Sequence, residues 1–150
     1  MRLVIQRVSE ASVEVDSAEI SKIKVGMLIL VGVEEGDSPS DVEWLASKTA
    51  NMRIFNDDEG VMNLSILSVG GEVLAISQFT LTASTKKGNR PSYIRAAAPD
   101  TAAPLYELYC EKLSGLIGKE VKKGIFGADM KVKLINDGPV TIIIDSRLKE

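Results

Sequence analysis

The chain contains about eight short apolar runs but only two helical stretches, and this ratio limits its fold more than any other feature. Because strands and helices do not alternate, a doubly wound parallel sheet is not expected. We predict an α+β fold, a mostly antiparallel sheet or open β-barrel with two main helices packed on it. The predicted strands cover residues 3–8, 12–15, 27–33, 72–79, 120–126, 129–135 and 140–145, and 61–67 is either a short strand or an irregular segment.

Two stretches carry helix signals. Ser38 is the expected N-cap of the first helix, with Pro39 at its first position. Asp100 is the expected cap of the second, which runs to about Ile117 and closes at Gly118. One face of the first helix is predicted to be buried, and its residues are Val42, Leu45, Ala46 and Thr49. In the second helix, Pro104 is expected in the first turn.

The length of 150 residues is close to that of one ordinary domain, and neither a repeat nor a linker interrupts it. We therefore expect a single domain over residues 1–150. No apolar run approaches the ~20 residues that span a bilayer, and the start of the chain is too short and too charged for a secretory signal. A cytoplasmic protein without a membrane partner is expected.

The chain has no histidine and a single cysteine, Cys110. This excludes an intrachain disulfide, Ser-His-Asp and Cys-His hydrolysis within the chain, and histidine-based metal sites. Cys110 falls in a helical apolar pattern, which favours a buried thiol over a nucleophile. No cofactor and no metal ion are predicted. The acidic stretch 56–60 lacks the ligand spacing of a calcium loop and is interpreted as a solvated turn.

The charge is small overall but unevenly distributed. A net charge of −3 argues against non-specific nucleic-acid binding, and no DNA partner is expected. Residues 34–59 hold eight acids and two bases, whereas 84–95 hold four bases and no acid. Residues 119–133 add five lysines against two acids. These basic segments either hold a polyanion locally or are solvated surface, and charge alone favours solvated surface.

Two loop-forming motifs are ambiguous from the residues alone. Gly124 and Gly127 bracket Phe126, which suits close approach of a ligand or a β-bulge equally well. Asn136-Asp137-Gly138-Pro139 is a turn signal between two strand-like runs, and its carbonyl groups need a partner in water, another subunit or a substrate. A third motif, Ser77-Gln78-Phe79-Thr80-Leu81, ends a buried strand. Its polar side chains either orient a ligand or satisfy local backbone groups.

The last two motifs together resemble the paired signature of the D-aminoacyl-tRNA deacylases, the D-tyrosyl-tRNA deacylase family. Further agreement occurs in the family's order over essentially the whole chain. These stretches are Ile5-Gln6-Arg7-Val8, Arg53-Ile54-Phe55, Met62-Asn63-Leu64, Arg90-Pro91-Ser92 and Phe126-Gly127-Ala128-Asp129-Met130. Two long motifs in order are much more specific than either one alone.

The resemblance implies a homodimer that acts on aminoacyl-tRNA, with sites at the subunit interface. A cis Gly138-Pro139 step of one subunit would reach into the partner's pocket, and Arg7 would support it. Main-chain carbonyls placed where an L side chain points would reject L-aminoacyl-tRNA by a clash. Glycine has no side chain, so glycyl-tRNA should pass this filter.

The same resemblance assigns the remaining site residues. Ser77, Gln78 and Phe79 would bind the aminoacyl group, and Thr80 would lie beside the ester, so Thr80, Gln78 and Phe79 are the expected catalytic residues. Phe126, Gly127 and Met130 would lie near the terminal adenosine. Two alternatives remain open: an esterase with a Ser77 or Thr80 nucleophile and a lysine base, and a nucleic-acid-binding module without chemistry.

Overall fold

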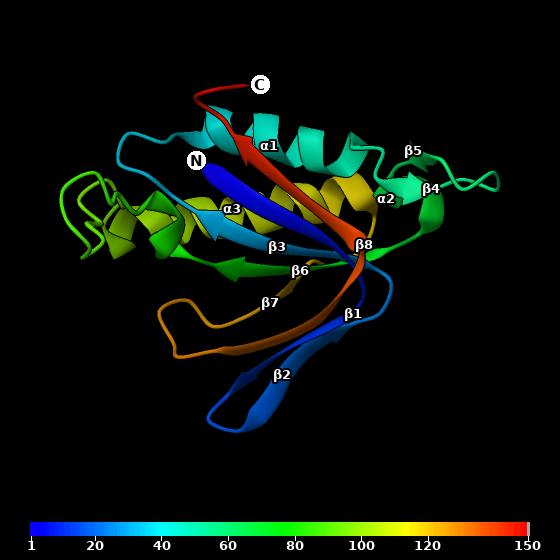
Figure 1. Ribbon diagram of the computed structural model, residues 1–150, viewed down its shortest axis with the longest axis horizontal. Coiled ribbons are helices and arrows are strands. Elements are labelled where there is room, and N and C mark those ends of the chain that lie inside the picture. The colour runs from blue at the N-terminus through cyan, green and yellow to red at the C-terminus, as the bar shows by residue number, and fades with distance from the viewer. Residues whose placement is uncertain (150) are drawn as a thin grey trace.

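A mixed six-stranded sheet is the centre of the computed structural model, which describes residues 1–149 (Figure 1). The sheet runs in the order β2-β1-β3-β6-β7, and β8 pairs with the second edge of β1. β1 is antiparallel to β2, β3 and β8, whereas the β3–β6 and β6–β7 pairs are parallel. The strands are β1 (Arg2–Val15), β2 (Ala18–Ile23), β3 (Gly26–Gly32), β6 (Glu72–Ser77), β7 (Lys122–Lys123) and β8 (Lys131–Asp145).

The sheet curls because β1 changes partners along its length. Its first half, residues 2–8, pairs with β3, and its second half, residues 11–15, pairs with β2. Figure 1 shows β1 and β8 bending away from the helices toward β2. The result is a nearly closed barrel, and the predicted α+β class is confirmed. The expectation of a mostly antiparallel sheet holds around β1, but the β3–β6–β7 part is parallel.

Helices α1 (Pro39–Asn51) and α3 (Pro99–Ile117) pack on each other and cover one face of the sheet (Figure 1). The predicted start of α1 is confirmed, because Ser38 and Asp41 form a capping box and Pro39 follows the cap. Its predicted apolar face is also buried, together with Ala50. Thr49 and Tyr109 join the two helices through hydroxyl groups 3.0 Å apart.

The predicted cap of α3 is wrong by two residues. The N-cap is Ala98, Pro99 is the first helical residue, and Asp100 lies in the first turn. Proline suits the first position because it has no N–H group to satisfy there. Gly118 ends the helix in the left-handed region, as predicted. Pro104 lies inside the helix.

Several predicted strand boundaries differ from the structure near the turns of the chain. The runs 3–8 and 12–15 form one strand, and the neighbour of its second half is β2, which the sequence analysis did not find. Asp16 and Ser17, both with positive φ, make the two-residue turn between them. Gly70 is the left-handed C-cap of the short helix α2 (Ile66–Val69). The 61–67 run contributes β5 (Met62–Leu64), which pairs with β4 (Phe55–Asn56).

The segments 129–135 and 140–145 are one strand, β8, rather than two. Both of its halves pair antiparallel with β1, so the Asn136-Asp137-Gly138-Pro139 segment is not a hairpin corner. Gln6 and Val8 of β1 pair with Thr141 and Asn136, which are five residues apart on β8. The extra residues leave the ladder as a bulge opposite Arg7. Only Lys122–Lys123 of the predicted strand 120–126 form a strand, β7.

A buried ionic cluster around Asp37 fastens the two ends of the described chain to the start of α1. The Asp37 carboxylate accepts a hydrogen bond from the amino group of Met1 at 2.7 Å, and both groups are fully buried. It also accepts from the Glu34 N–H group at 2.6 Å and from the Arg147 guanidinium at 3.0 Å.

Within residues 1–149, no helix has the length and apolar character required to cross a bilayer.

Replacing Asp37 by Asn should therefore destabilise the fold. The substitution leaves the buried Met1 ammonium without its counter-charge, and breaking such a pair costs about 3–5 kcal/mol. Urea unfolding followed by circular dichroism measures the loss. The control is Glu43→Gln, which breaks the exposed Lys112–Glu43 pair and should cost less than ~1 kcal/mol. Equal losses in the two variants would contradict the structural role of Asp37.

Candidate functional site

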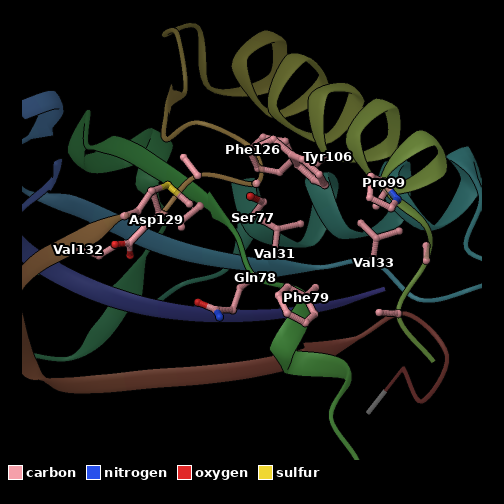
Figure 2. Close-up of a pocket in the computed structure, with 17 residues that line it drawn as sticks. Val31, Val33, Ser77, Gln78, Phe79, Pro99, Tyr106, Phe126, Asp129 and Val132 are labelled. Carbon is pink, nitrogen blue, oxygen red and sulfur yellow. The ribbon is translucent and has the colours of Figure 1, made fainter. Parts of the chain in front are cut away.

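A cavity of about 550 Å³ lies between the sheet and the N-terminal half of α3 (Figure 2). Its walls are mostly apolar, with a few polar groups at one side, which is the usual composition of a small-molecule site. Five segments line it: the end of β3, the end of β6, residues 96–106, the loop between β7 and β8, and the start of β8 at Val132. The polar lining residues are Ser77, Gln78 and Asp129; the apolar and aromatic ones include Val31, Val33, Ile76, Phe79, Tyr106, Phe126 and Met130.

The parallel pairing of β3 and β6 places the polar motif at the cavity. Val31 lies opposite Ser77 in the register, so the carboxyl ends of both strands meet at one edge. The chain then leaves β6 through Gln78, whose N–H donates to the Val31 carbonyl at 2.8 Å. Figure 2 shows Gln78 and Phe79 at the end of this strand. Phe79 remains exposed, and its ring packs edge-on against Tyr93 with centroids 5.0 Å apart.

The loop before β8 supplies the opposite wall. The centroid of the Phe126 ring lies 6.1 Å from that of the Tyr106 ring, and Figure 2 shows Phe126 next to Tyr106, which belongs to α3. Gly127 adopts a positive φ of 79°, which turns the chain at this wall. Gly124 packs closely against Met130, so a Cβ at this position would require the flexible Met130 side chain to move. Residues 124–130 belong to no strand, so the bulge interpretation of this segment is wrong.

Thr80 lies beside the cavity but not in its wall. It belongs to a 3₁₀ helix over Phe79–Thr82, and its hydroxyl accepts a hydrogen bond from the Gln78 side-chain amide. The N–H groups of Phe79 and Thr80 open this helix, and the structure gives neither a partner among residues 1–149. The Ser77 hydroxyl also has no hydrogen-bond partner there. Backbone N–H groups and a free hydroxyl are thus available for a ligand at this edge.

Ionisable groups suited to proton transfer are scarce at the cavity. Tyr106 donates its hydroxyl proton to the Ala75 carbonyl at 2.8 Å, and burial raises the pKa of Tyr106 far above its ordinary value. Asp129 is exposed and pairs with Lys131 at 3.1 Å. No lysine or arginine lines this cavity in the described part of the chain. Tyr106 and Asp129 were not predicted as site residues, although Asp129 lies in the family stretch 126–130, because their place at the cavity depends on the packing of α3 and the loop.

Cys110 is buried in α3, as expected. Burial raises the pKa of its thiol to about 12, so the group stays protonated at neutral pH and is a poor nucleophile. Among residues 1–149, no group of three or more Cys, Asp or Glu side chains is placed to hold a metal ion.

Gly138 and Pro139 lie outside this cavity. The bond between them is cis, and both residues are exposed on the surface of the β8 bulge. Arg7 holds the bulge from beneath: its Nε donates to the Asp137 carbonyl at 3.0 Å, and its Nη1 donates to the Ile54 carbonyl at 2.8 Å. A Cβ on Gly138 would approach the Arg7 Nη2 to 3.0 Å and the Val140 Cγ2 to 2.8 Å, at a φ of +131°. The site residues therefore form two groups, one in the cavity and one on the bulge.

The Asn136 side chain completes the bulge. Its amide donates to the Arg7 carbonyl at 3.0 Å and to the Val140 carbonyl at 2.9 Å, so it bridges β1 and β8 where their ladder is interrupted. These bonds and those of Arg7 define one conformation for a segment that the residues alone predict as a simple turn.

Comparisons with known proteins agree on one family. Residues 4–145 match the family model described as D-Tyr-tRNA(Tyr) deacylase. A D-aminoacyl-tRNA deacylase from Bacteroides fragilis is 63% identical over 150 residues, which cover all of both chains. A solved structure named c-Myc DNA Unwinding Element Binding Protein is 37% identical with a TM-score of 0.92, and the match covers 97% of this chain and 98% of that one. A probable eukaryotic D-amino acid tRNA deacylase, 15% identical with a TM-score of 0.81 over 95% of this chain and 97% of that one, shares the fold.

Proposed function

The chain belongs to the D-Tyr-tRNA(Tyr) deacylase family and is a hydrolase of ester bonds, and we propose that it proofreads translation in the cytoplasm by removing D-amino acids from tRNA. The observation that carries this proposal is the cavity edge at Ser77-Gln78-Phe79. There a parallel strand pair presents polar groups and free backbone N–H groups to an apolar space of about 550 Å³. An amino acid esterified to a ribose needs both an apolar seat and a polar edge.

In this proposal the two walls of the cavity bind the two ends of the ester. Ser77, Gln78 and Phe79 hold the aminoacyl group. Phe126, Gly127 and Met130 hold the terminal adenosine, for which an aromatic ring offers stacking. The close contact of Phe126 with Tyr106 supports this assignment, because it fixes the ring at the wall.

Selection against L-amino acids is proposed to come from a second copy of the chain. Gly138 and Pro139 are exposed and outside their own cavity, so they can act on a cavity only in another molecule. A two-fold homodimer would place each bulge in the partner's site. The Arg7 contacts support this role, because a filter that works by collision must not move when an L side chain presses on it. Glycyl-tRNA, without a side chain, would be hydrolysed.

The chemistry is proposed to rest on positioning. The free N–H groups of Phe79 and Thr80 are placed to stabilise the oxyanion, and each such donor is worth ~2.7–4 kcal/mol in a protease. The ribose hydroxyl next to the ester positions or activates the attacking water. The Thr80 hydroxyl, oriented by Gln78, assists beside the ester. No covalent acyl-enzyme is formed.

The two alternatives receive less support. A Ser77 or Thr80 nucleophile would require a base, and no lysine lines the cavity in residues 1–149. A nucleic-acid-binding module without catalytic activity would need no cavity for a single amino acid. The name of the 37% identical structure refers to DNA binding by that protein. Turnover of aminoacyl-tRNA by this chain distinguishes catalysis from binding alone.

The purified protein should release D-tyrosine from D-tyrosyl-tRNA and leave L-tyrosyl-tRNA intact. The expected preference in kcat/KM is at least a hundredfold, since a clash with fixed main-chain atoms costs several kcal/mol. Release of the radiolabelled amino acid from matched D and L substrates measures it. Tight binding of both substrates without hydrolysis would instead identify a binding module.

Replacing Thr80 by Ala should slow the hydrolysis of D-aminoacyl-tRNA about tenfold, the equivalent of one hydrogen bond of ~1.4 kcal/mol. The control is Thr101→Ala, an exposed threonine outside the cavity wall, which should retain the full rate. Quenched reactions analysed by mass spectrometry should show no acylated protein in the wild type or the variant. An ester adduct on Ser77 or Thr80 would overturn positioning catalysis.

Replacing Arg7 by Lys should weaken the discrimination between D and L substrates. Lysine keeps the charge but lacks the planar fork that holds the Asp137 and Ile54 carbonyls together. We expect the D/L ratio of kcat/KM to fall at least tenfold, mainly through faster hydrolysis of L-aminoacyl-tRNA. Arg53→Lys, at an exposed position, is the control. An unchanged D/L ratio in a folded Arg7→Lys protein would count against the bulge as the filter.

A further inference from the structure

Two basic segments, 84–95 and 119–133, are candidates for contact with RNA, and they differ in whether their charges already have partners. We propose that the first, the basic loop of residues 84–95, binds the phosphates at the 3′ end of the tRNA, and that the second does not. This inference rests on the proposed function, because it deals with how the same substrate is held. It is carried by charge pairing, by the anchoring of the loop and by its position at the cavity.

The lysines of residues 119–133 already have partners. Four of them lie within 4.0 Å of a carboxylate, which cancels most of the local positive potential, and the fifth donates to a backbone carbonyl. The pairs are Lys122 with Glu120, Lys123 with Glu107, Lys131 with Asp129, Lys133 with Glu14, and Lys119 with the Gly70 carbonyl. A phosphate would have to compete with these carboxylates. This segment is therefore a balanced surface.

The basic loop is different. Lys86, Lys87 and Arg90 are exposed, and none of them forms an ion pair with any residue in 1–149. The loop holds no acidic residue of its own. Arg95 is the exception, since it approaches the buried Glu34 at 3.9 Å and donates to the Thr82 carbonyl at 3.1 Å. Three uncompensated charges thus project from a loop whose base is held by the fourth.

The base of the loop is fastened next to the cavity. Ser84 and Ser92 exchange two backbone hydrogen bonds of 2.9 Å, which close the loop. Tyr93 packs against Phe79, the exposed aromatic residue of the cavity wall. Ala96 and Ala97, which follow the loop, line the cavity directly. The three free cations therefore lie on the chain segment that leads into the mouth of the proposed ester site.

The N-terminus of α3 lies at the same edge of the cavity, and the exposed Asp100 in its first turn offsets part of its positive charge. Pro99, its first residue, lines the cavity, and the N-terminal end of a helix carries a partial positive charge. The whole chain carries a formal charge of −3 and the basic loop carries +4, so the rest of the chain carries −7. A polyanion would be attracted to this edge and repelled elsewhere, which orients it with respect to the cavity.

The position identifies the partner as the end of an RNA strand. If the ester lies in the cavity, the phosphates of the preceding nucleotides must leave through its mouth, where the basic loop lies. The bases of this single-stranded end would find the exposed edge of Tyr93, which is 39% exposed, as a stacking surface. A blunt duplex has no single-stranded end to place there, so a DNA duplex is not the expected ligand.

The test compares two triple variants that each remove three positive charges. Lys86→Ala/Lys87→Ala/Arg90→Ala alters the basic loop, and Lys119→Ala/Lys122→Ala/Lys133→Ala is the matched control. Binding of tRNA that carries no amino acid is measured between 50 and 200 mM salt. The slope of the logarithm of the association constant against the logarithm of the salt concentration is negative, and the loop variant should reduce its magnitude by about 2. Three phosphate contacts to a single strand contribute ~0.7 each. The control should keep the wild-type slope.

A second measurement tests whether the effect of the loop variant depends on the phosphates of the substrate. The ratio of kcat/KM for D-aminoacyl-tRNA to kcat/KM for D-aminoacyl-adenosine, which carries no phosphate, should fall at least tenfold in the loop variant and less than twofold in the control. Equal effects of the two variants, or a loop variant with the wild-type salt slope, would overturn the inference. So would equal, loop-dependent binding of a DNA duplex of the same length. Absence of hydrolysis by the wild type would refute the proposed function, while the tRNA-binding slopes would still decide the role of the loop.

Discussion

Pairing along both edges of β1 is the constraint on which the rest of the structure depends. One edge aligns β3, whose parallel partner β6 then delivers Ser77, Gln78 and Phe79 to the cavity. The other edge aligns β8, and the interruption of that ladder opposite Arg7 creates the Gly138-Pro139 bulge. Both groups of site residues are therefore fixed by one strand. A slip of one residue in β1 would turn Arg7 away from the bulge and the apolar residues of β1 away from the core.

The elements that could be predicted from the sequence are those whose signals are local. Ser38 and Pro39 mark the start of α1 because capping and proline chemistry act within one turn. The apolar run 27–33 is nearly the whole of β3, and the α+β class follows from the spacing of such runs. The resemblance to the deacylase family, confirmed by the match over residues 4–145, came from two motifs in order. Both motifs lie at the ends or interruptions of strands, where backbone geometry restricts the residues.

The features that escaped prediction depend on tertiary contacts. β2 is largely exposed and polar, and it forms a strand only because the turn at Asp16-Ser17 folds it onto β1. The β8 bulge looks like a turn in the sequence because its pairing on both sides is with a strand more than 120 residues away. Tyr106 and Asp129 line the cavity only after α3 and the β7–β8 loop pack against the sheet. No local pattern contains this information.

Few ionisable groups lie at the cavity, so discrimination between D and L substrates and affinity for tRNA would come from different groups. The groups next to the proposed ester are main-chain N–H groups, hydroxyls and aromatic rings. In the proposed homodimer the bulge of the other subunit would add main-chain carbonyls, and Arg7 anchors that bulge through the Asp137 carbonyl. These groups are fixed in geometry and insensitive to pH near neutrality, which suits discrimination by shape. Three exposed cations without a carboxylate partner in residues 1–149, Lys86, Lys87 and Arg90, lie instead on the basic loop, where they can attract RNA but cannot distinguish D from L. Chirality and tRNA affinity would then reside in different parts of the chain, so that either can change by mutation without loss of the other.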